Sequence, residues 1–162
     1  MRLAGEPPTE SDIEDVTRLI GRTPQGDFRV VVRTATGEPV VVMNAPLLDD
    51  GTPMPTLYWL VGSAEVYAVS QLEADGAVNE VEAIIGLDAI EDIHASYAQR
   101  RDALIPETHT GHRPSAGVGG TRRGVKCLHA HFAHWLAGGN DAVGEWVAQQ
   151  LDARGIERAQ RI

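Results

Sequence analysis

The stretch FRVVVRTATGEPVVVMN, residues 28–44, decides the fold class of this chain. Two runs rich in β-branched residues, Phe28–Thr34 and Pro39–Asn44, flank the turn-forming residues 35–38. β-Branched side chains favour extended backbone, and a short link containing glycine joins two such runs into an antiparallel hairpin. We therefore expect a hairpin here, followed by a third strand over residues 56–61.

Apolar residues at helical spacing dominate the rest of the chain. The first helix is predicted to begin with a capping box of Ser11 and Glu14 and to end at Gly21. Further helices are expected over 63–75, 78–86, 88–106, 121–137 and 141–154. The pattern predicts a single α+β domain over 1–162, in which a small antiparallel sheet is packed by five to six helices. The first helix and the hairpin occupy 11–61, and the helical part occupies 63–154.

Composition and charge exclude several classes of protein. The chain has 162 residues, a net charge of -9 and one cysteine, Cys127. The negative charge argues against nucleic-acid binding, and the single cysteine excludes an intramolecular disulfide. The sequence contains neither a long apolar run nor the basic and apolar regions of a signal peptide, so we expect a cytoplasmic protein without membrane insertion.

Residues 108–140 differ in charge from the rest of the chain. They contain no Asp or Glu, but they hold Arg113, Arg122, Arg123 and Lys126, together with five of the six histidines. In an acidic protein this exclusion of carboxylates keeps a local positive potential. We therefore expect the functional loop and helix of the protein to lie within 108–137.

The glycine-rich loop 117–126 is a candidate anion site. Backbone N–H groups at the start of a helix, together with nearby cations, are the ingredients of a phosphate or carboxylate site. The alternative is that the glycines only serve a tight crossing and that the arginines are solvated. The predicted ligand-binding residues are Gly119, Gly120, Arg122, Arg123 and Lys126.

The histidines around Cys127 have three interpretations. The first is a zinc site of Cys127, His131 and His134, which share a face of the expected helix, completed by His112. The second is a reactive thiol: cations and a helix start lower a thiol pKa, His131 is available as a base, and Cys127 and His129 are the candidate catalytic residues. Its acidic partner has to come from elsewhere in the fold. The third is that Cys127 is a small core residue and that the histidines are hydrogen-bonded.

Three motifs carry a family resemblance. They are GVKCLHA at 124–130, GTPMPTLYWL at 51–60 and LEADG at 72–76. The chain resembles the bacterial domain of unknown function 501 family over nearly its whole length. The resemblance implies a cytoplasmic protein that is often encoded beside a septum-formation initiator and an exopolyphosphatase-like enzyme.

These observations together predict a pocket that takes a small ligand bearing a phosphate or a carboxylate. Its walls would be the loop and the helix start, so that Arg122, Arg123, Lys126, Cys127 and His129 converge on one concave surface. The sequence does not decide between a binding protein and an enzyme.

The alternative is a non-catalytic interaction protein linked to cell division or envelope growth. In that case the same segment is merely structural, and a protein partner docks on an exposed apolar patch near Tyr58, Trp59 and Tyr67.

Overall fold

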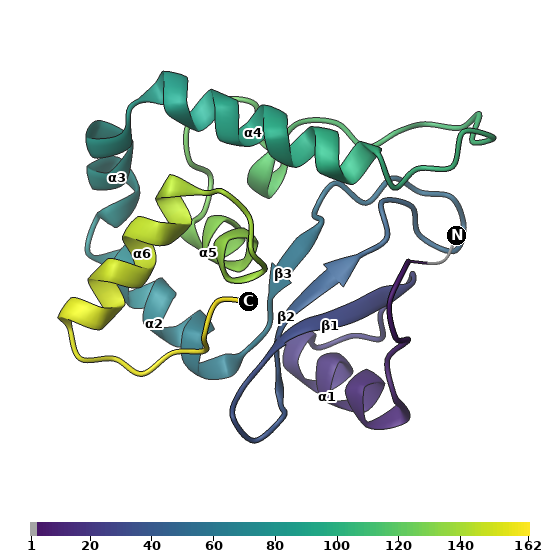
Figure 1. Ribbon diagram of the computed structural model, residues 1–162, viewed down its shortest axis with the longest axis horizontal. Helices are drawn as coiled ribbons and strands as arrows, with labels where there is room; N and C mark the ends of the chain where they lie inside the picture. The colour runs from purple at the N-terminus through teal and green to yellow at the C-terminus, as the bar shows by residue number, and fades with distance from the viewer. Residues whose placement is uncertain (1–2) are drawn as a thin grey trace.

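A three-stranded antiparallel sheet forms the middle of the protein in its computed structural model, which describes residues 3–162 (Figure 1). Helix α1 (Glu10–Ile20) packs on one face of the sheet, and the other helices lie on the opposite side. The strands run in the order β1 (Phe28–Arg33), β2 (Pro39–Asn44) and β3 (Tyr58–Leu60). The predicted α+β class is therefore confirmed.

The hairpin of β1 and β2 forms where the sequence predicts it. Phe28 pairs with Asn44, and Arg33 pairs with Pro39. The turn closes with a hydrogen bond from the Thr34 N–H to the Glu38 carbonyl (2.9 Å), and Gly37 adopts a φ of 95°. Glycine suits this position because a Cβ atom disfavours the left-handed region.

The N-cap of the first helix lies two residues earlier than predicted. Its capping box is formed by Thr9 and Asp12 rather than by Ser11 and Glu14. Asp12 also forms an ion pair with Arg33 of β1 (2.7 Å), and this contact holds the pKa of Asp12 at about 2. Of the two similar capping sequences, Thr9 to Asp12 and Ser11 to Glu14, the one that forms the cap also makes an ion pair with the sheet. Gly21 ends the helix as predicted.

Five helices form the layer on the other side of the sheet. Helix α5 contacts β3, α2 and α6, so it lies at the centre of this layer. Helix α4 begins directly after Gly86, and no side chain caps its N-terminus. The helices are α2 (Ser63–Ala74), α3 (Ala77–Ile85), α4 (Leu87–Asp102), α5 (Leu128–Leu136) and α6 (Ala142–Ala153), with a 3-10 turn η1 (Val118–Gly120) before α5.

Helix α5 is shorter than predicted. Residues 121–126, expected as its first turns, form bends, and Cys127 is the N-cap residue of a helix that begins at Leu128. Gly124 has a φ of 65°, which an α-helix does not accommodate. Cys127 therefore precedes the helix and does not continue the stripe of His131 and His134.

The apolar interior has two parts. The larger core lies between the sheet and the layer of five helices and includes Val41, Leu128 and Phe132. The smaller core lies under α1 and includes Val16 and Val42. Within residues 3–162, no helix combines the length and the apolar character needed to cross a bilayer.

Candidate functional site

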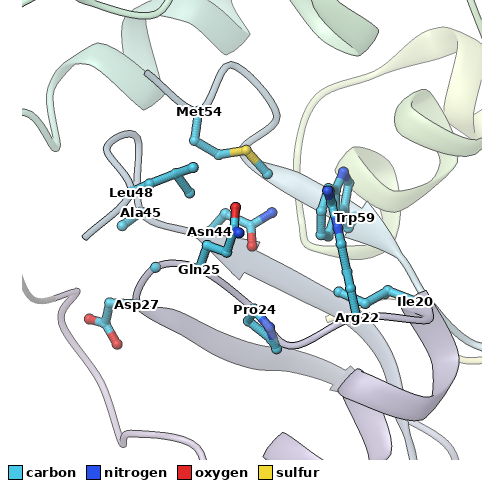
Figure 2. A pocket seen from close by; sticks show the side chains of 11 residues that line it. Ile20, Arg22, Pro24, Gln25, Asp27, Asn44, Ala45, Leu48, Met54 and Trp59 are labelled. Carbon is cyan, nitrogen blue, oxygen red and sulfur yellow. The ribbon is translucent and has the colours of Figure 1, made fainter. Parts of the chain in front are cut away.

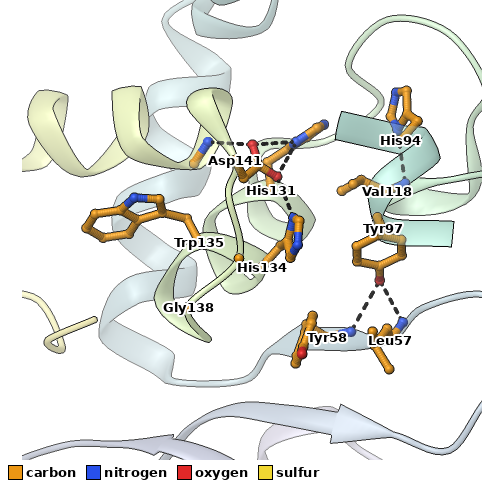
Figure 3. Close-up of polar contacts among 12 residues, drawn as sticks. Leu57, Tyr58, His94, Tyr97, Val118, His131, His134, Trp135, Gly138 and Asp141 are labelled. Carbon is orange, nitrogen blue, oxygen red and sulfur yellow. Dashed lines mark hydrogen bonds and ion pairs between the residues drawn. The ribbon is translucent and has the colours of Figure 1, made fainter. Parts of the chain in front are cut away.

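The segment before α5 is tied to α4 by a buried histidine. The Nδ1 atom of His94 accepts a hydrogen bond from the Val118 N–H (3.0 Å; Figure 3), so its Nε2–H donates to the Gly124 carbonyl (2.7 Å). Burial lowers the pKa of His94, in agreement with this neutral form. A Cβ atom on Gly117 would lie 2.5 Å from the Cβ of His94, so the close crossing needs glycine at this position.

Two carboxylates from preceding helices also bind this segment. Glu82 of α3 accepts a hydrogen bond from the Val125 N–H (2.7 Å), and Glu73 of α2 accepts one from the Leu128 N–H (2.7 Å). A Cβ atom on Gly124 would lie 2.7 Å from Glu82 Oε1, so glycine here lets the carboxylate approach the backbone. Two of the backbone donors that the sequence offers to an external anion are thus bound by the protein's own carboxylates.

Glu73, Cys127 and His129 form a half-buried cluster at the start of α5. Each of the three offers a ligand atom, and these atoms all lie within 4.8 Å of one another. Glu73 Oε1 lies 3.2 Å from His129 Nδ1. Within residues 3–162, this cluster is the only group of three or more His, Cys, Asp or Glu side chains that could hold a metal ion. The acidic partner that the sequence left undefined is therefore close to the predicted pair of Cys127 and His129.

The second ring nitrogen of His129 faces two oxygen atoms of α2. His129 Nε2 lies 3.2 Å from the Val66 carbonyl and 3.1 Å from Ser70 Oγ. The Ser70 hydroxyl donates its own hydrogen to Val66 (2.7 Å), so both oxygens accept from Nε2–H. The neighbouring Cys127 side chain and the Glu73 carboxylate raise the pKa of His129 against the opposing effect of burial.

His131 and His134 belong to a separate, buried cluster. Their Nδ1–H groups both donate to Asp141, the N-cap residue of α6, at 2.9 Å (Figure 3). Asp141 also accepts from the Gly144 N–H (3.0 Å). Burial alone would raise the pKa of Asp141, but the hydrogen bonds from the two histidines hold it at about 2. His131 Nε2 is buried without a hydrogen-bond partner.

The remaining predicted residues are dispersed along the loop. His112 is exposed, and its carbonyl accepts a hydrogen bond from His109 (3.0 Å). A Cβ atom on Gly119 would lie 3.9 Å from Cys127 Sγ, whereas Gly120 faces open space. The structure thus brings Cys127 and His129 together and places His131 and His134 at Asp141. The zinc set that combines Cys127 with His131, His134 and His112 stays a prediction.

The predicted cations point outward. Arg122, Arg123 and Lys126 are exposed. Arg122 lines an open groove of about 350 Å³ between α4 and residues 114–117. The groove is also lined by apolar side chains of α4 and by two carboxylates, Glu91 and Asp102.

A buried arginine supports the loop that forms this groove. Arg101 of α4 is only 1 % exposed, and its guanidinium donates to the carbonyls of Pro55 (3.2 Å) and Ala116 (3.0 Å). Ala116 has a φ of 63°, a conformation that costs a non-glycine residue about 1–2 kcal/mol. Arg101 thus holds a strained loop against the strand side of the molecule.

Another hollow lies on the strand side, between the end of α1 and the loop that follows β2 (Figure 2). Its volume is about 100 Å³, well below the roughly 300 Å³ at which ligand pockets begin. Arg22 lies over the ring of Trp59 at its edge, 5.5 Å from the ring centre. None of the residues predicted to bind a ligand or a metal, or to be catalytic, lines it.

Several residues of the site carried no local signal in the sequence. Glu73 and Ser70 lie on α2, and Asp141 follows the acid-free segment by one residue. Glu73 does fall in the motif LEADG at 72–76, which marked the resemblance without assigning a role. Tyr58, expected on an exposed patch, is buried at 1 % exposure, so that patch is not formed around it.

Comparison with known proteins identifies the family. The family model described as "Protein of unknown function (DUF501)" matches residues 30–149. This range contains the groove, both histidine clusters and the sheet except for the first two residues of β1. No curated protein and no solved structure matches the chain.

Proposed function

Because the chain belongs to the DUF501 family of proteins of unknown function, its role has to be argued from the site, and we propose that it binds a small organic anion. The ligand bears a phosphate or a carboxylate group. Arg122 in the groove beside α4 is its principal contact, and Arg123 and Lys126 supply further positive charge.

One observation carries this proposal. Within residues 3–162, the cations whose side chains have no hydrogen bond, ion pair or aromatic ring contact are Arg113, Arg122, Arg123 and Lys126. They are the four cations of the acid-free segment 108–140. The other described arginines have a carboxylate, a carbonyl or an aromatic partner. Within residues 3–162, no carboxylate therefore neutralises these four cations.

Two nearby carboxylates do not neutralise these cations. Glu82 and Glu73 approach the segment, but each accepts a hydrogen bond from its backbone instead of pairing with Arg123 or Lys126. The backbone donors at Val125 and Leu128 are thereby used, so the guanidinium and ammonium groups have to provide most of the contacts to a ligand.

The groove itself limits the kind of anion. Ala95, Ala98 and Pro114 offer apolar surface to the body of a ligand. Glu91 and Asp102 in the same groove repel extended polyanions. A small ligand with one anionic end directed at Arg122 fits this distribution better than a nucleic acid or a long polyphosphate.

Anion binding can be tested with the purified protein. Inorganic phosphate, polyphosphate, nucleotides and small organic acids are screened by thermal shift, and ligands that stabilise the protein are titrated by calorimetry. We expect Arg122→Ala to weaken binding roughly ten-fold or more, because a hydrogen bond to a charged group contributes about 1.5–3 kcal/mol. Arg113→Ala is the matched control: it removes another unpaired cation of the segment, but one that does not line the groove.

Two outcomes would contradict the proposal. Equal loss of affinity in Arg113→Ala and Arg122→Ala would mean diffuse attraction instead of a site. If no anion stabilises the wild type more than the double variant Arg122→Ala/Arg123→Ala, the interaction-protein alternative takes its place.

A further inference from the structure

The cluster at the start of α5 has the donor set of a metal site. Glu73 offers a carboxylate oxygen, Cys127 a sulfur and His129 a ring nitrogen, and all three atoms lie within 4.8 Å of one another. We propose that these side chains bind one divalent transition-metal ion, for which zinc is the best match, and leave a fourth coordination position open to solvent. This inference is independent of the proposed anion site.

The donor chemistry selects the class of metal. Thiolate, imidazole and carboxylate are the three ligand types of zinc, whereas calcium and magnesium take oxygen ligands. Zinc bonds of about 2.0–2.3 Å in tetrahedral geometry place donor atoms roughly 3.3–3.8 Å apart. The 3.2 Å between Glu73 Oε1 and His129 Nδ1 is close to this spacing. Cys127 Sγ lies within 4.8 Å of a ligand atom on each of the other two side chains, so the sulfur is the third donor of the set.

Supporting hydrogen bonds orient two of the ligands. His129 Nε2–H faces the Val66 carbonyl and Ser70 Oγ, so Nδ1 is the atom directed at Glu73. Metal-binding histidines usually donate their other ring N–H to an oxygen acceptor, which sets both the tautomer and the ring orientation. Glu73 Oε1 is itself held by the Leu128 N–H (2.7 Å).

A metal ion fits the charge balance of the cluster. His129 Nδ1 and Glu73 Oε1 face each other at 3.2 Å, and a metal ion bound between them would require an unprotonated Nδ1 and the thiolate form of Cys127. One carboxylate and one thiolate neutralise a divalent cation. The competing interpretation is that Glu73 merely caps α5 and pairs with His129, and it predicts no metal affinity.

The cluster is also accessible. The side chains of His129 and Glu73 are 24 % and 27 % exposed, and Cys127 is half-buried. Three protein ligands with solvent at the fourth position are typical of catalytic zinc sites, whereas structural sites have four protein ligands. The geometry therefore points to a site in which the metal can meet a further ligand.

Titration of the metal-depleted protein with Zn²⁺ and Co²⁺ alone tests this proposal. We expect one equivalent to bind, and bound Co²⁺ to show a thiolate-to-cobalt charge-transfer absorption that Cys127→Ser abolishes. Glu73→Gln should weaken binding more than ten-fold because it removes a ligand. Ser70→Ala should weaken it roughly ten-fold, the lower end of the 10–100-fold cost of losing a supporting group, because the Val66 carbonyl still accepts from His129. His112→Asn, at an exposed histidine of the preceding loop, is the control and should bind as the wild type does.

Melting curves without metal show which variants are folded. Cys127→Ser changes one atom at a half-buried position, so it keeps the test decisive even if Glu73→Gln fails to fold. The proposal is overturned if no stoichiometric binding occurs, if the cobalt spectrum lacks the thiolate absorption, or if His112→Asn loses affinity as Cys127→Ser does. None of these measurements involves an anionic ligand, so they leave the proposed function to its own test.

Discussion

Helix α5 carries two histidine clusters that differ in exposure rather than in chemistry. At its start, His129 pairs with Glu73 at 24 % and 27 % side-chain exposure, next to the half-buried Cys127. Further along, His131 and His134 share Asp141, which is fully buried. Both clusters join an imidazole to a carboxylate of another element. In the buried cluster the Asp141 carboxylate is satisfied by donors of the protein itself and stabilises the fold, whereas the accessible cluster can also bind a ligand.

The largest expected effect is at the buried cluster. Asp141→Asn removes the negative charge that accepts hydrogen bonds from His131, His134 and Gly144. A hydrogen bond to a charged group contributes about 1.5–3 kcal/mol, and because two buried donors lose their charged acceptor, we expect the free energy of unfolding measured with urea to fall by about 3 kcal/mol. Asp152→Asn is the control, because Asp152 is 57 % exposed in its pair with Arg158 and should cost less than about 1 kcal/mol. Equal effects of the two substitutions would contradict the comparison.

The dependence of stability on pH should distinguish the buried cluster as well. The pKa of Asp141 is about 2 in the folded protein, below the ordinary 3.8. The unfolded chain therefore binds more protons in acid, so this contribution is complete above pH 3.8 and is lost as the pH falls towards 2. It amounts to roughly 2 kcal/mol. Urea unfolding between pH 2 and pH 6 should show a smaller acid loss in Asp141→Asn than in the wild type. Asp12, which has the same pKa of about 2, should retain its own share in that variant.

A smaller effect is expected at the accessible cluster. Glu73→Gln keeps the shape of the side chain but removes the charge that faces His129 and the N-terminus of α5. Carboxylates near a helix N-terminus contribute about 0.3–1 kcal/mol, so the free energy of unfolding should fall by about 1 kcal/mol. A loss as large as that in Asp141→Asn would mean that Glu73 is a core structural residue, and the contrast between the two clusters would fail.

The hairpin and most helix ends could be predicted from the sequence because neighbouring residues set them. Gly21 ends α1 in the left-handed conformation, and Asp141 caps α6 through the Gly144 N–H, three residues away. The absence of acidic residues from 108–140 can likewise be read from the sequence alone, and the four cations of this segment are unpaired and exposed in the structure. These features depend on local backbone preference and on composition.

The start of α5 and the composition of both clusters were decided by the tertiary structure. The bond of His94 to Gly124 spans 30 residues, and that of Glu82 to Val125 spans 43, and both hold the backbone outside the helix that local periodicity predicts. Glu73 reaches His129 across 56 residues. Such partners are specified only when α2, α3 and α4 pack beside the segment, because a carboxylate on a distant helix has no local pattern that marks its target. The sequence by itself therefore determined which segment is free of acidic residues and rich in histidines, and the packing of the helices determined which side chains of other elements meet it.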